Sequence, residues 1–201
     1  MAPKPTRRPR QEALYHIAER QAGYFTAAQA AQAGFSWERL SYYAAQGRFL
    51  RVAKGIYRLV QFPASPFEDL FRAWLRCGPG SVISHDSALA VYGLSDVLPG
   101  EVHVTVPRSA SRRRPGIRMH TGKLRRGDVT AREGLPLTTV PRTISDVARA
   151  GVAEEHVRQA VSEALRRGLA DSRSLLAEAR RRKGRAAVIV RDEVARLRTV
   201  A

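Results

Sequence analysis

The stretch at residues 26–47, TAAQAAQAGFSWERLSYYAAQG, constrains the fold of this chain more than any other feature. Thr26 can cap a short first helix, and Ser36 can cap a second helix that ends at Gln46. Gly34 can supply a left-handed turn between them, because glycine has no side chain to clash in that conformation. Two helices joined by a short glycine turn predict a helix-turn-helix.

One further helix and a hairpin flank this pair. Apolar residues at helical spacing predict a helix over 11–22. After the pair, the stretch 47–60, GRFLRVAKGIYRLV, predicts two strands joined by a tight turn at Gly55. The positions expected to be buried are Phe49, Val52, Ile56 and Leu59. The remaining positions carry Arg48, Arg51, Lys54 and Arg58. Three helices and a basic hairpin together predict a winged helix-turn-helix.

Beyond this region the pattern becomes a mixture of helices and strands. Helices are expected over 66–76, over 84–92 with Ser84 as cap, and from Pro141 to 150. Strands are expected over 101–107 and 116–122, the second as the partner of the first. The predicted organisation is a flexible basic arm at 1–10, a winged helix-turn-helix domain at 11–62, and a C-terminal α/β domain at 66–201 with a helical tail from about 153. The predicted fold class is α+β.

The charge of the chain makes a polyanion the first partner to consider. Lysine and arginine number 35 against 18 acidic residues, for a net charge of +17. A GC-rich genome that encodes arginine wherever a cation is tolerated is the competing explanation, since only four of these cations are lysine. The distribution is more informative. Residues 1–60 carry ten cations and three acids, 101–132 carry nine and two, and 151–201 carry twelve and seven.

The second helix of the pair is the candidate recognition helix. Arginine suits the two acceptors of guanine and glutamine suits adenine, and both types occur here. By spacing, Trp37, Leu40 and Ala44 share one face, which suits a core seam. A polar outer face is also ordinary for any surface helix, and one tyrosine can equally belong to the core. The candidate DNA contacts on or beside this helix are Ser36, Trp37, Arg39, Tyr42, Tyr43 and Gln46.

Cations on the hairpin suit the phosphates beside a groove that the preceding helix occupies. The candidates are Arg48, Arg51 and Lys54. The alternative is that charge on an edge strand prevents pairing with other chains. Accessory contacts to phosphate or to the minor groove are expected from the arm, through Arg7, Arg8 and Arg10.

A second cationic cluster follows the first predicted strand of the C-terminal domain. It could contact more DNA, bind RNA or meet an acidic protein, and a solvated charged loop explains it nearly as well. Its members are Arg108, Arg112, Arg113, Arg114, Arg118, Lys123, Arg125 and Arg126.

Signals for catalysis are weak. The residues that could be combined into a nuclease or metal site match no strong zinc spacing; they are His85, Asp86, Glu101, His103, His120 and Asp146. His85 is better explained as a hydrogen-bonding group at a helix start, and Asp146 as an ion-pair partner of Arg142. We therefore expect no catalytic residue, metal or cofactor.

Compartment signals are simple. Cys77 is the only cysteine, so an internal disulfide is excluded. No apolar run is long enough to cross a membrane, and the basic start of the chain lacks the apolar core of a signal peptide. A cytoplasmic protein is expected.

The order of motifs resembles the AbiEi-type antitoxins of bacterial type IV toxin-antitoxin systems. The motifs are YFTAAQAAQAGFSWERLSYYAAQGRFLRVAKGIYRL, VISHDSALAVYGL, EVHVTVP and GLPLTTVPRTISDVA, within about residues 11–150. The resemblance implies an operator-binding winged helix-turn-helix, with the recognition helix at 36–46 and the wing at 48–59.

The resemblance also implies partners. Members of this family repress their own operon and counteract a nucleotidyltransferase-like toxin, typically without a stable complex. Operator DNA with repeated half-sites, bound by two copies or a homodimer, is therefore expected. The alternatives are a nuclease-related protein, as in relatives that continue into an endonuclease domain, and a module that binds RNA or protein. The sequence ends where such a catalytic domain would begin, which disfavours the nuclease.

Overall fold

The computed structural model describes residues 10–94, 99–107 and 114–200, and these form two compact units. Unit 1 comprises Met1–Pro79 with Arg132–Leu135, and unit 2 comprises Gly80–Ala131 with Pro136–Ala201. The α+β fold class predicted from the sequence is confirmed.

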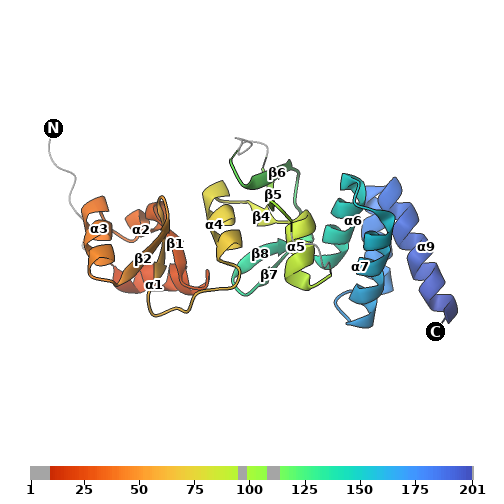
Figure 1. The fold of residues 1–201 in the computed structure, drawn as a ribbon, viewed down its shortest axis with the longest axis horizontal. Coiled ribbons are helices and arrows are strands. Elements are labelled where there is room, and N and C mark those ends of the chain that lie inside the picture. The colour runs from red at the N-terminus through yellow and green to blue at the C-terminus, as the bar shows by residue number, and fades with distance from the viewer. Residues whose placement is uncertain (1–9, 95–98, 108–113, 201) are drawn as a thin grey trace. The chain divides into compact units, whose positions relative to one another are not determined.

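Unit 1 contains the helix-turn-helix and its hairpin (Figure 1). Its elements in chain order are α1 (Gln11–Glu19), β1 (Tyr24–Thr26), α2 (Ala27–Gln32), α3 (Trp37–Ala45), β2 (Phe49–Ala53), β3 (Ile56–Leu59) and α4 (Glu68–Cys77).

The local signals of the helix pair behave as predicted. Thr26 caps α2 in a reciprocal arrangement: its hydroxyl accepts from the Gln29 amide at 3.1 Å, and the Gln29 side chain accepts from the Thr26 amide at 2.8 Å. Gly34 adopts the left-handed turn, with φ at 86°. The Ser36 hydroxyl then accepts from the Arg39 amide at the start of α3. Each end of the turn is therefore fixed by residues that the sequence identifies.

The sheet of unit 1 has a strand that the sequence did not predict. The antiparallel order is β1-β3-β2, so β3 is central. Helix α1 ends at Glu19 rather than near residue 22, because the chain turns to pair Tyr24 with Arg58 of β3. Tyr24 and Phe25 are fully buried, and their burial holds this three-residue strand in place.

Both faces of the central strand are covered. Tyr57 and Leu59 enter the core formed with the first three helices. On the other face Arg58 is buried, donates to the Phe62 carbonyl and lies over the Tyr24 ring. Tyr24 in turn stacks on Phe71 of α4. Arg58 is therefore a structural residue, not one of the exposed charges that the alternation of the hairpin predicted.

Unit 2 combines a mixed sheet with five helices among its described residues (Figure 1). The elements from Gly80 onward are β4 (Val82–Ile83), α5 (His85–Tyr92), β5 (Val102–Val106), β6 (Ile117–Thr121), the 3-10 helix η2 (Arg126–Asp128), β7 (Val129–Arg132), β8 (Leu135–Thr138), α6 (Val140–Ala150), α7 (Glu154–Arg166), α8 (Ser172–Arg182) and α9 (Arg185–Val200).

The sheet order is β6-β5-β4-β8-β7, which makes β6 an edge strand. The predicted pairing of β5 with β6 is confirmed, and it is parallel. Strands β4, β7 and β8 have two to four residues each and were not predicted. The prediction that Ser84 caps α5 is wrong: its hydroxyl accepts from Thr105 at 2.8 Å and contacts His85 Nδ1 at 3.0 Å instead.

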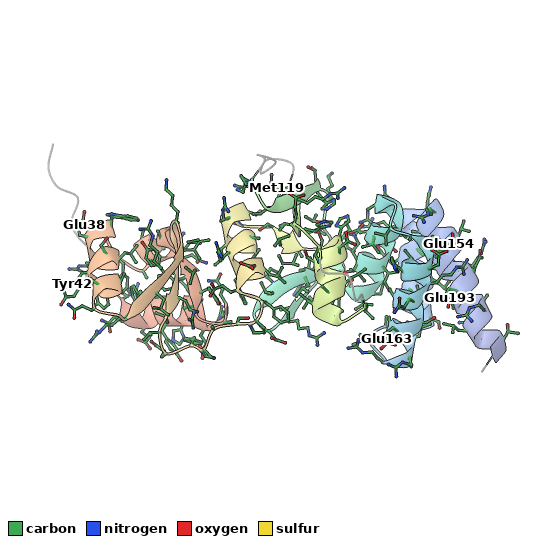
Figure 2. All side chains as sticks on the ribbon, in the orientation of Figure 1. Glu38, Tyr42, Met119, Glu154, Glu163 and Glu193 are labelled. Carbon is green, nitrogen blue, oxygen red and sulfur yellow. The ribbon has the colours of Figure 1, made fainter. Side chains whose placement is uncertain are left out.

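The predicted helical tail consists of α7, α8 and α9, and a buried carboxylate joins two of these helices. Glu193 of α9 accepts hydrogen bonds from Ser162 at 2.7 Å and from Arg158 of α7 at 3.3 Å. Arg196 donates to the same carboxylate at 2.6 Å and is the first of the causes that lower the pKa of Glu193 to about 2. Figure 2 labels Glu154 and Glu193 on these two helices.

A buried arginine holds α6 against its neighbours. Arg142 donates to Asp146 at 2.7 Å and to Asp128 of η2 at 2.6 Å. Asp128 and Asp146 also accept from Arg181 and Arg182 of α8. All three central side chains are at least 90% buried, so each charge depends on its partners. The predicted pairing of Arg142 with Asp146 is confirmed.

We expect Arg142→Ala to destabilise unit 2 by about 3 kcal/mol, because two buried carboxylates lose their central partner. Urea unfolding followed by circular dichroism measures this, since both tryptophans lie in unit 1. The control is Arg149→Ala at the exposed end of α6, with an expected change below about 0.5 kcal/mol. Equal unfolding free energies for the two variants would contradict the role of Arg142.

Candidate nucleic-acid interface

The outer face of α3 presents two aromatic side chains to solvent. Trp37 is 55% exposed and Tyr42 is 61% exposed, and Figure 2 shows Glu38 and Tyr42 on this helix. The prediction that Trp37 shares a core seam with Leu40 is wrong. Leu40 is buried, whereas Trp37 is the first residue of α3 and lies beyond the edge of the core. Exposed aromatic rings on a helix are well suited to contact bases or sugars.

The other candidates on α3 differ in how accessible they are. Tyr43 is half-buried, packs on Phe35 and Phe49, and accepts from Gln11 at 2.8 Å. Gln46 is exposed at the C-terminal cap. Arg39 is half-buried, and its Nη1 atom is buried without a hydrogen-bond partner among the described residues. Tyr43 thus faces the core side of α3, while Arg39 has an unmet donor.

The predicted wing lies directly after α3 and packs against it through β2. Arg48, Arg51 and Lys54 are all exposed, and none forms an ion pair with any described residue. Arg48 lies over the Tyr43 ring, with its guanidinium carbon 5.6 Å from the ring centroid. The wing therefore offers three cations whose charge no carboxylate of the described chain neutralises.

Cations of the C-terminal helices behave differently. Most are paired with acidic residues that are adjacent in sequence, one turn away or on another helix, with N–O distances from 2.5 to 3.8 Å. These paired arginines are Arg158, Arg166, Arg167, Arg181, Arg182, Arg191 and Arg196. Much of the charge of this segment is consequently neutralised within the protein, whereas none of the three wing cations is paired with an acidic residue of the described chain.

The second cationic cluster is only partly within the described residues. Of this cluster, Arg108, Arg112 and Arg113 lie outside them. Of the arm cations, Arg7 and Arg8 also lie outside the described residues, and Arg10 is exposed before α1. Arg118, Lys123, Arg125 and Arg126 are exposed on or after the edge strand β6. Arg114 is half-buried and donates to the Met119 sulfur at 3.5 Å. One exposed cation thus lies on the edge strand β6, and three lie in the segment between β6 and β7.

Three histidines meet in unit 2, although they are far apart in the sequence. The His85 and His120 rings stack with centroids 3.5 Å apart, and the His103 ring is 5.1 Å from His120. His103 Nδ1 lies 3.3 Å from the Asp86 carboxylate but is not aligned for a hydrogen bond. The pairing of β5 with β6 brings His103 and His120 together, and the sequence predicted this pairing but not its parallel register.

This histidine cluster (His85, His103 and His120) is held neutral. Burial lowers the pKa of His85 to about 2 and that of His120 to about 4, and the neighbouring histidines act in the same direction. Burial also lowers the pKa of His103, against the opposing effect of Asp86. Among the described residues no group of three or more histidine, cysteine or acidic side chains is arranged to hold a metal ion. Two stacked imidazoles cannot both direct a nitrogen at one ion.

Comparison with known proteins identifies the N-terminal segment. Residues 12–60 match the family model described as a transcriptional regulator, AbiEi antitoxin. The resemblance predicted from the sequence is thereby confirmed for the segment that forms the helix-turn-helix and the wing. No curated protein matches the chain. Within the described residues no helix is both long and apolar enough to cross a membrane.

The histidine cluster should make unit 2 sensitive to acid. Because the folded-state pKa values of His85 and His120 lie below the unfolded value of 6.5, only the unfolded chain gains these protons as the pH falls below 6.5. Stability should therefore fall between pH 6.5 and 5 by about 1.4 kcal/mol per pH unit for each such histidine. Urea unfolding at several pH values measures the slope. His120→Gln should flatten it and the exposed-site control His156→Gln should not; equal slopes in the two variants would refute the assignment.

Proposed function

We propose that unit 1 binds double-stranded operator DNA and that the protein is an antitoxin-like autorepressor of a type IV toxin-antitoxin operon. In this proposal α3 enters the major groove and the β2–β3 wing lies over the adjacent phosphates. The observation that carries the proposal is the set of three exposed, unpaired wing cations beside α3, within the segment that matches a transcriptional-regulator family.

Different side chains suit the phosphate contacts and the base contacts with DNA. Phosphate contacts need exposed, unpaired cations, and Arg48, Arg51 and Lys54 meet that requirement. Base contacts need side chains that reach out of α3, and Trp37 and Tyr42 are its exposed aromatic residues. An apolar ring can contact the methyl group of thymine, and a tyrosine hydroxyl can bind phosphate.

Arg39 is proposed as the residue that reads guanine. A buried guanidinium N–H without a partner is unfavourable, so the Nη1 of Arg39 would gain by turning outward to an acceptor. Guanine offers two acceptors at the spacing of a guanidinium group. Ser36 supports this position, because its hydroxyl fixes the backbone of Arg39, and Gln46 is placed at the other end of the helix.

The proposal also covers the domain organisation, the accessory contacts and the partners of the protein. The domains are taken as an arm at 1–10, the winged helix-turn-helix at 11–62 and an α/β domain at 66–201. Accessory nucleic-acid contacts would come from the arm and from the exposed cations of the segment 118–126. The protein would act in the cytoplasm without catalysis, as two copies or a dimer on repeated half-sites. Its link to a nucleotidyltransferase-like toxin would be functional and would need no stable complex.

Wing variants test the phosphate contacts. We expect Arg51→Ala and Lys54→Ala each to weaken binding to all DNA sequences and to reduce the slope of log K against log salt by about 1. Fluorescence anisotropy between about 50 and 200 mM salt, on DNA from upstream of the protein's own gene and on a shuffled copy, measures both effects. Arg20→Ala, an exposed cation of unit 1 outside the wing, is the matched control. Slopes unchanged from the wild type would exclude the phosphate contacts.

A variant of α3 tests base reading. Arg39→Ala should reduce the preference for the upstream fragment over the shuffled copy by about 1–3 kcal/mol, since one base contact is lost. The salt slope should remain that of the wild type, which separates this variant from those of the wing. The ratio of the two dissociation constants at one salt concentration measures the preference. If Arg39→Ala kept the wild-type ratio of the two dissociation constants, base reading would belong to other residues.

A further inference from the structure

Unit 1 contains a surface pocket that the proposed DNA contacts do not explain. Its volume is about 370 Å³, and it lies between α1, the C-terminal half of α3 and the base of the β2–β3 hairpin. Ligand sites for small molecules commonly have volumes of about 300–1,000 Å³ and largely apolar or aromatic walls. All of its lining residues belong to unit 1, so the pocket is complete within that unit.

Four of the eleven residues that line the pocket are aromatic. Tyr15, Phe35, Tyr43 and Phe49 line it, together with aliphatic side chains. The Tyr43 ring stacks on Phe49 with centroids 5.1 Å apart and meets Phe35 edge to face. Packing on both neighbours fixes the orientation of Tyr43, so these rings form a preformed surface that suits a planar group.

Two polar groups converge on this aromatic surface. Arg48 lies over the Tyr43 ring and forms no ion pair with any described residue. The Tyr43 hydroxyl accepts a hydrogen bond from Gln11, which leaves its own proton available for donation. A guanidinium and a phenol hydroxyl at one site match the two oxygens of a carboxylate.

The acidic residue of the pocket lining, Glu12, would not repel a bound anion. Glu12 is part of the rim, but its side chain is 89% exposed and lies 3.9 Å from His16 on the solvent side of α1. Arg48 is the other charged residue of the lining, so the pocket combines an aromatic surface with an unneutralised cation.

We propose that this pocket binds a small aromatic carboxylate, with the carboxylate paired to Arg48 and the ring against Tyr43 and Phe49. The site also connects to DNA binding. Tyr43 belongs to α3, and Arg48 precedes the first strand of the wing. A bound carboxylate would neutralise Arg48 and remove one of the proposed phosphate contacts. Occupancy would therefore weaken DNA binding, and this regulatory part rests on the proposed function, whereas the binding part does not.

The binding part is tested without DNA. Benzoate and 2-naphthoate are titrated into the full chain by calorimetry, with benzamide and 2-naphthamide as neutral copies and cyclohexanecarboxylate as the non-aromatic acid. We expect saturable one-to-one binding of at least one aromatic carboxylate, and binding about tenfold weaker or more for its amide and for cyclohexanecarboxylate. Failure of both aromatic acids to bind saturably, or equal binding of acid and amide, would overturn the proposal.

Variants locate the site. Arg48→Gln should weaken binding of the aromatic acid about tenfold or more, while Arg20→Gln, the same change outside the pocket, should leave it unchanged. Tyr43→Phe keeps the packed ring and removes only the hydroxyl, so it should weaken binding while the melting temperature shows that unit 1 remains folded. Equal affinities in Arg48→Gln and Arg20→Gln would place the ligand elsewhere. An Arg48-dependent shift to a dimer on size exclusion without ligand would mean that a second copy fills the pocket, and would also overturn the proposal.

The regulatory part is tested with the upstream DNA fragment. Saturating aromatic carboxylate should raise the DNA dissociation constant of the wild type severalfold and have no effect on Arg48→Gln. If the acid binds but DNA affinity does not change, the coupling is refuted and the ligand site stands. If no DNA is bound under any condition, the proposed function fails, and the DNA-free titrations still decide the ligand site.

Discussion

Burial of β3 on both faces is the constraint on which unit 1 depends. Its four residues are no more than 9% exposed, although one of them is an arginine. One face completes the core under α1, α2 and α3, and the other is covered through Tyr24 and the α4 residue Phe71. A strand fixed in this way cannot slip in register without exposing its apolar side chains to solvent. The position of the wing relative to α3 is therefore determined by packing and not by any ligand.

Whether an arginine is paired or unpaired decides its availability to a polyanion, which the net charge of the chain does not show. Buried or bridged arginines such as Arg58, Arg142 and Arg158 complete hydrogen-bond networks inside their units. Such residues raise the net charge of the chain without offering a surface to a polyanion. Exposed cations without an ion pair, such as those of the wing, remain available to release counterions from DNA. A GC-rich coding bias and a nucleic-acid surface can thus coexist in one sequence.

Much of unit 1 could be predicted from sequence because its signals are local. The capping residues Thr26 and Ser36 and the glycine turn at Gly34 act within a few positions of the elements they define. Strand β1 was missed because three residues carry no periodicity, and it forms only through pairing with β3. The exposure of Trp37 was missed because helical spacing gives the face of a residue but not where the core ends. The histidine cluster was not predicted because the alternation that identifies β5 and β6 as partner strands does not give their parallel register.

The two sides of α3 give this helix separate tasks. Trp37 and Tyr42 are exposed, whereas Tyr43 is turned toward Phe35, Phe49 and the pocket. Adjacent residues on a helix point about 100° apart, so Tyr42 and Tyr43 present different surfaces although their rings meet edge to face. Arg48 is the residue common to both sides, because its long side chain lies over Tyr43 while its guanidinium remains exposed. Its two proposed partners, a phosphate and a carboxylate, would require the same donors, so they would compete directly without any change in the fold of unit 1.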